Sequence, residues 1–128
     1  MTEQEEIVRK YLRAVEVFED ITPFVSGQAV FIEHPNAINR NGQTRNLEQA
    51  LKGLSVGRSI LAWQKNLLFS IVESGSIIFA EVEWTGQMAI DAGHLKKNQL
   101  LKAHCAFRFE FSAGKIMRQI SYDCYEPF

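Results

Sequence analysis

Basic charge, clustered cysteines and long apolar runs are all scarce in this sequence. Lysine and arginine total 14 against 15 aspartate and glutamate residues, so the net charge is −1. Proteins that bind DNA or RNA usually carry a basic excess or a basic stripe. Neither is present, so no nucleic-acid partner is expected. Cys105 and Cys124 stand alone, without the close second cysteine that a zinc site or a redox pair needs.

The marks of export and of membrane insertion are missing as well. No apolar run approaches the roughly 20 residues that a membrane-spanning helix needs. The first ten residues are acidic and carry no hydrophobic segment of a signal peptide. The 3 histidines lack the close spacing of metal ligands. We therefore expect a cytoplasmic protein with reduced thiols, no metal, no cofactor and no membrane partner.

The sequence does contain enough apolar material for one hydrophobic core. The chain has 128 residues, of which 46% are hydrophobic, 11% aromatic and 23% charged. This balance is typical of a globular protein, and the length is that of one domain. Residues 1–128 are therefore predicted to form a single domain.

Two helices are predicted from capping residues and apolar periodicity. Thr2 with a glutamate three residues later is a capping-box signature, and apolar residues then recur at helical spacing over residues 3–19. Asn46 can cap a second, leucine-rich helix. Within that helix, Gly53 and Gly57 predict an end or a kink, because glycine weakens a helix.

Strand patterns account for most of the remaining chain. A short strand is predicted at residues 29–33, followed by a long polar loop at 35–46. After Trp63 the apolar period changes to two, which predicts a meander of antiparallel strands. The meander strands cover residues 64–73, 78–88, 100–111 and 116–125. Helices followed by a meander indicate an α+β fold, with the helices on one face of a curved antiparallel sheet.

Five side chains on these elements are candidates for a small-molecule pocket. His34 ends the first strand beside the polar loop. Because histidine titrates near neutral pH, His34 is either a proton acceptor or a turn histidine that is hydrogen-bonded to the backbone. Tyr11 lies on the apolar face of the first helix, where its hydroxyl either polarises a ligand carbonyl or bonds a core acceptor. Trp84, Met88 and Phe107 lie on apolar strand faces, which form either a cavity wall or plain core.

The register of the last hairpin decides where Asp123 lies. A two-residue or four-residue turn places Asp123 opposite His104, a pairing in which a carboxylate orients a histidine. Both side chains then lie on the face opposite the phenylalanines. A three-residue turn with Gly114 in a bulge moves Asp123 to the phenylalanine side, away from His104. The sequence leaves both registers open.

In element order and in two short motifs, the chain resembles the nuclear-transport-factor-2-like superfamily, in particular the SnoaL-like polyketide cyclases and ketosteroid isomerase. The motifs are Glu33-His34-Pro35 after the first strand and the final hairpin FRFEFSAGKIMRQISYDCYEPF. The resemblance implies a cone-shaped, cystatin-like domain with an internal pocket between the sheet and the helices. It also implies a homodimer.

The resemblance further implies roles for individual residues. Tyr11 matches the tyrosine on the first helix of ketosteroid isomerase, and His34 precedes Pro35 where the isomerase has its aspartate base. SnoaL-like cyclases use an aspartate on the last strand with histidines nearby, which Asp123, His34 and His104 match. The predicted catalytic residues are His34, Asp123 and Tyr11, and the predicted ligand contacts are Trp84, Met88, His104 and Phe107.

Two functions follow from these predictions. The first is a cofactor-independent isomerase, cyclase or lyase that transfers protons on a small apolar carbonyl compound. The second is a non-catalytic ligand-binding or dimerisation domain. A carboxylate and a histidine inside a closed cavity favour the enzyme, whereas His34 and Asp123 turned outward favour the binding domain. In either case the outer sheet face is predicted to join two copies, through Glu81, Glu83, Arg108 and either Gln119 or Arg118.

Overall fold

The computed structural model describes all 128 residues and contains two helices and six strands. Their bounds are α1 (Glu3–Glu16), β1 (Val25–Glu33), β2 (Gln43–Arg45), α2 (Leu47–Ile60), β3 (Leu61–Ser74), β4 (Ile77–Met88), β5 (Leu100–Ser112) and β6 (Lys115–Tyr125). The strands form one sheet in the order β2-β1-β6-β5-β4-β3. All neighbouring strands are antiparallel except β1 and β6, which are parallel. The predicted α+β architecture is confirmed.

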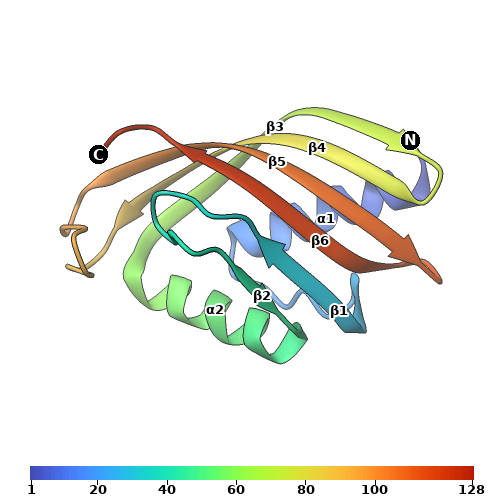
Figure 1. Cartoon of the computed structure of the whole chain (residues 1–128), viewed down its shortest axis with the longest axis horizontal. Helices are drawn as coiled ribbons and strands as arrows, with labels where there is room; N and C mark the ends of the chain where they lie inside the picture. The colour runs from blue at the N-terminus through green and yellow to red at the C-terminus, as the bar shows by residue number, and fades with distance from the viewer.

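Both helices lie on the same side of the bent sheet (Figure 1), where α1 packs on β3 and α2 packs on β1. The core fills the space between them. Its largest fully buried side chains include Val8 of α1, Ile78 of β4 and Phe109 of β5. Neither helix is long and apolar enough to cross a membrane. The bent sheet and its two helices therefore enclose the interior in which a pocket was predicted.

The helix starts are those that the capping residues predict. The Thr2 hydroxyl accepts a hydrogen bond from the Glu5 backbone N–H, and Asn46 forms a complete capping box with Gln49. The predicted ends are less accurate. α1 stops at Glu16, three residues early, and α2 continues through both glycines to Ile60. The prediction that Gly53 or Gly57 ends α2 is wrong, because the helix continues through both residues to Ile60.

The polar loop predicted at 35–46 contains one more strand. β2 has only three residues, all polar or charged, and it pairs antiparallel with the end of β1. β1 itself begins at Val25, four residues before its predicted start, and its parallel pairing with β6 shifts register between Val25 and Val30. β1 and β2 therefore extend the sheet beyond the meander and form a second wall of its interior.

The last hairpin has a register that combines parts of both predicted alternatives. The turn residues Ala113 and Gly114 both have positive φ, and Ser112 pairs with Lys115, as in a two-residue turn. Met117 then forms a one-residue bulge, because Phe111 pairs with Ile116 whereas Glu110 pairs with Arg118. Beyond the bulge Cys105 lies opposite Asp123, and His104 lies opposite Cys124. The predicted pairing of His104 with Asp123 is therefore wrong.

Candidate functional site

Two adjoining cavities lie between the sheet and the helices. The first, here called the sheet cavity, has a volume of about 200 Å³ and lies between α1 and the inner face of β3 to β6. The second, here called the helix cavity, has a volume of about 220 Å³ and lies between β1, β2 and α2. The residues that line both are Tyr11, Val15, Glu33, Gln119 and Ser121. A larger groove of about 310 Å³ lies outside, between Trp63 and Phe128, and contains none of the predicted site residues.

Asp123 lies in the wall of the sheet cavity. The bulge in β6 turns it to the same face as Cys105, its partner across the strands. Its Oδ2 accepts a hydrogen bond of 3.2 Å from the Ser121 hydroxyl, and the Cys105 thiol also bonds its carboxylate. Burial raises the pKa of Asp123, the nearby Glu33 charge adds to this rise, and the two hydrogen bonds oppose it. Asp123 is therefore a carboxyl group that holds its proton more strongly than an exposed aspartate.

Glu33 is a second carboxylate on the cavity wall, and the sequence analysis missed it. It comes from the end of β1 and lines both cavities. Its Oε1 accepts from Gln43 Nε2 at 3.0 Å and its Oε2 accepts from Asn36 Nδ2 at 2.7 Å. The alternation of strand residues could have predicted this position. Glu33 lies two residues after the apolar Phe31 and therefore lies on the same inward face of β1.

The same alternation places His34 outside the cavities. His34 is exposed, its backbone N–H donates to Ser121 O at 3.1 Å, and its ring stacks on Tyr122 at 4.6 Å between centroids. The prediction that His34 lies in the pocket is wrong, because the strand turns Glu33 inward and its neighbour outward. His104 was also predicted at the pocket and is also outside. Its Nε2 lies 2.8 Å from Glu126 Oε2 on the exposed outer face.

Tyr11, Trp84 and Phe107 all line the sheet cavity. The Tyr11 hydroxyl donates a hydrogen bond to Gln119 Oε1, and burial raises the pKa of Tyr11. The indole N–H of Trp84 donates to Gln64 Oε1 at 2.8 Å. Met88 was predicted beside Trp84, but it is 1% exposed and does not line the cavity, so it belongs to the core.

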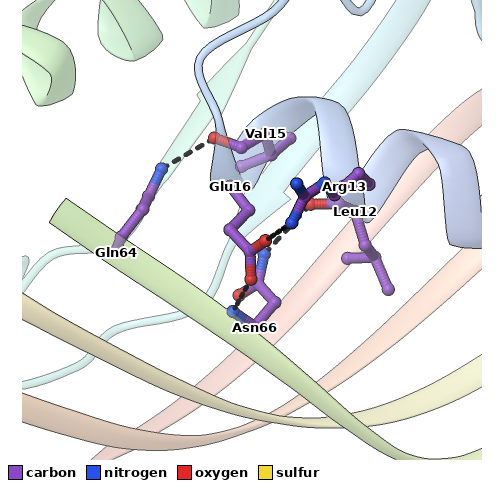
Figure 2. Close-up of polar contacts among 6 residues, drawn as sticks. All are labelled: Leu12, Arg13, Val15, Glu16, Gln64 and Asn66. Atoms are coloured by element: carbon purple, nitrogen blue, oxygen red, sulfur yellow. Dashed lines mark hydrogen bonds and ion pairs between the residues drawn. The ribbon is translucent and has the colours of Figure 1, made fainter.

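Side chains of β3 hold the end of α1 over the sheet cavity (Figure 2). Gln64 Nε2 donates to Val15 O at 2.7 Å, and Asn66 Nδ2 donates to Leu12 O at 3.2 Å. The Glu16 carboxylate accepts from the Asn66 backbone N–H at 2.7 Å. These bonds fix the helix turn that follows Tyr11.

The polar groups of the sheet cavity are suited to moving protons. Its wall carries the carboxyl groups of Asp123 and Glu33 and the hydroxyls of Tyr11 and Tyr125, without a lysine, arginine or histidine. Burial raises the pKa of Tyr125, and Asp123 adds to this rise. No three His, Cys, Asp or Glu side chains converge as metal ligands would. The site therefore combines aromatic walls with the Asp123 carboxyl group, whose pKa is raised.

Comparison with known proteins supports the fold and leaves the activity open. No protein-family model matches the chain, and no curated protein matches its sequence. Among solved structures, the candidate polyketide cyclase IdmH from Streptomyces antibioticus has a TM-score of 0.79 and 13% identity, over 95% of this chain and 92% of its own. A candidate SnoaL-like polyketide cyclase from Jannaschia sp. CCS1 has a TM-score of 0.77 and 14% identity, over 94% of this chain and 85% of its own.

An NTF2-like protein of unknown function from Burkholderia pseudomallei has a TM-score of 0.78 and 11% identity, over 95% of this chain and 91% of its own. All three similarities extend over nearly the whole chain at low identity. The chain therefore has the NTF2-like fold.

Proposed function

We propose that this NTF2-like domain catalyses proton transfer on a small carbonyl compound, as an isomerase or a cyclase, with Asp123 as the group that takes and returns the proton. The observation that carries the proposal is the Asp123 carboxyl group, whose pKa burial raises, in the wall of a cavity with aromatic sides. A catalytic acid or base works best when its pKa lies near the working pH. The raised pKa of Asp123 moves this carboxyl group toward that range.

The reaction step is the removal of a proton from the carbon next to a carbonyl. The Asp123 carboxylate takes the proton, and the electron pair of the C–H bond becomes an enolate. The enolate either recovers the proton at another carbon, which is isomerisation, or attacks a second carbonyl of the same molecule, which is ring closure. The similar structures with cyclase names are compatible with the second outcome.

Two other residues have supporting roles in this proposal. Tyr11 comes from α1 and Asp123 from β6, so a ligand between helix and sheet can contact both. The Tyr11 hydroxyl exchanges its Gln119 partner for the enolate oxygen and stabilises the developing charge by donating a hydrogen bond. Glu33 stays occupied by its two amide donors and favours the protonated form of Asp123 through its charge.

The experiment measures exchange of the methylene protons of phenylacetone in D₂O by NMR, with and without the protein. We expect protein-dependent exchange that Asp123→Asn abolishes, because an amide cannot accept the proton. Asp91→Asn is the matched control, since Asp91 is exposed and only bonds the Lys97 N–H. Exchange that is equal in wild type and Asp123→Asn would refute the catalytic role. Binding without any exchange would support the non-catalytic binding domain.

We also propose that two copies associate through the outer sheet face. Four apolar side chains of β3 and β4 are 45% to 61% exposed there: Leu67, Phe69, Val72 and Phe79. Contiguous exposed apolar patches mark interaction surfaces. Charged groups of both signs surround this patch, including Glu81 and Arg118, and Arg108 lies over the Phe79 ring at 5.6 Å. A face with both charges and a central apolar patch can pair with itself.

A further inference from the structure

The helix cavity contains a cationic side chain for which the protein supplies no acceptor. Arg45 is the last residue of β2, is half-buried and lines this cavity. Its guanidinium takes part in none of the ion pairs of the chain, and none of the side-chain hydrogen bonds involves it. A guanidinium has five N–H donors. Every fully buried polar side-chain atom of the chain has a partner, so the free donors of Arg45 are open to solvent and accessible to an acceptor that enters the cavity.

Gly53 of α2 makes room for that guanidinium. A glycine inside a helix costs roughly 1 kcal/mol relative to alanine, so its presence in the middle of α2 needs a reason. A Cβ at this position would lie 2.2 Å from Arg45 Nη1 and 3.0 Å from Arg45 Cζ. The guanidinium therefore lies directly against the α2 backbone. A side chain at position 53 would therefore require the guanidinium to shift.

The one carboxylate that borders the same cavity does not neutralise Arg45. Glu33 lines the helix cavity, but its oxygens accept hydrogen bonds from Asn36 and Gln43 and it forms no ion pair. The remaining wall combines apolar side chains, among them Ile21, Phe31 and Leu54, with the polar Gln43, Gln119 and Ser121. A guanidinium next to these apolar side chains suits an organic anion that has an apolar part.

We propose that Arg45 binds a carboxylate of the ligand in the helix cavity, while the carbonyl of the same ligand lies beside Asp123 in the sheet cavity. A guanidinium binds a carboxylate through two parallel N–H···O bonds, which fixes both position and orientation. The two cavities share five wall residues and therefore adjoin, and a ligand that takes the place of the bond between Tyr11 and Gln119 would extend from one into the other. This inference rests on the proposed function. It narrows the substrates to small carboxylic acids that carry a second carbonyl group, separate from the carboxylate.

The test compares phenylacetate with phenylacetamide, which have nearly the same shape and differ in charge. Isothermal titration calorimetry at pH 7 measures both affinities for wild-type protein and for four variants. We expect wild type to bind the acid at least about tenfold more tightly than the amide, as one charge-assisted bidentate contact predicts. Arg45→Met keeps the length of the side chain, removes the charge and should abolish the preference. Arg40→Met removes an exposed arginine outside the cavities and should keep it.

Gly53→Ala provides a second, independent variant, because alanine favours the helix while its methyl group displaces the guanidinium. We expect a folded protein, verified by circular dichroism, with a reduced preference for phenylacetate. Equal affinity of wild type for the two probes, no measurable binding of phenylacetate, or an unchanged preference in Arg45→Met would overturn the proposal. Asp123→Asn should retain the preference, so this experiment fails or succeeds separately from the proton-exchange test.

Discussion

Replacing Gln64 with leucine tests how the cavity wall is held together. Gln64 lies on β3 and forms two bonds to other elements: Nε2 donates to Val15 O at 2.7 Å, and Oε1 accepts from Trp84 Nε1 at 2.8 Å. Leucine fills most of the same volume and forms neither bond. The substitution therefore leaves the Trp84 indole N–H without a partner, and it leaves Val15 O with only the 3.3 Å bond from the Phe18 backbone N–H.

The size of the effect follows from one unpaired donor and one lost hydrogen bond. Leaving a buried donor unsatisfied costs about 1–3 kcal/mol, and a lost hydrogen bond costs about 1 kcal/mol. Partial access of water places the Trp84 donor at the low end of its range, so we expect Gln64→Leu to lower the free energy of unfolding by about 2 kcal/mol. For a domain of this size, that change corresponds to a melting temperature lower by about 6–10 °C.

Gln87→Leu is a closely matched control, because Gln87 also accepts from an indole N–H and donates to a backbone carbonyl, but at a solvent-exposed position. Its Oε1 accepts from Trp63 Nε1 at 2.9 Å and its Nε2 donates to Asn98 O at 3.2 Å, both on the exposed side. Water can replace these bonds, so we expect a loss of at most about 0.5 kcal/mol. Urea unfolding followed by circular dichroism measures both variants. Equal losses for the two glutamines would refute the argument that the Gln64 bonds hold α1 and Trp84 in place.

Two further predictions concern Asp123 and the outer face. Because burial raises the pKa of Asp123 above its unfolded value, the folded protein binds more protons between the two values, and wild type loses stability as the pH rises through that window. Asp123→Asn should therefore be more stable than wild type at pH 7 and lose this advantage below about pH 4; a difference in urea midpoint that does not vary with pH would contradict this sign. Phe79→Glu places a charge in the proposed interface, so wild type should sediment as a dimer and this variant as a monomer, whereas Val17→Glu, an exposed site on the far side of the domain, should stay dimeric. A wild-type monomer at micromolar concentration would rule out the interface.

Local signals were sufficient to predict most of the elements. The capping residues Thr2 and Asn46 mark helix starts to the residue, since the bonds that they form are local. The long strands of the meander alternate so regularly that their existence and order are predictable from period alone. β2 could not be predicted in this way, because three polar residues have no period and pair only through the neighbouring edge of β1. Gly53 was misleading for a related reason: its role depends on Arg45, which lies outside its helix.

The candidate site depends on single-residue choices that local patterns do not settle. At the end of β1, the adjacent Glu33 and His34 lie on opposite faces. Glu33 lines the cavity, whereas His34, the predicted proton acceptor, faces solvent. In β6, the extra residue Met117 reverses the face of every residue after it, relative to an unbroken two-residue hairpin.

The bulge at Met117 also explains how one strand serves both the core and the site. Before the bulge Ile116 is fully buried in the core next to Phe111, and after it Gln119, Ser121 and Asp123 face the cavities. Without the extra residue, the apolar Ile120 would lie on the inner face in register with Ile116, and Asp123 would lie outside, opposite His104. The strand would then complete an ordinary core and present no carboxyl group to a ligand. A bulge is a common means of redirecting a side chain near a functional site. In this chain it exchanges core packing for the half-buried Asp123 carboxyl group on which the proposed chemistry depends.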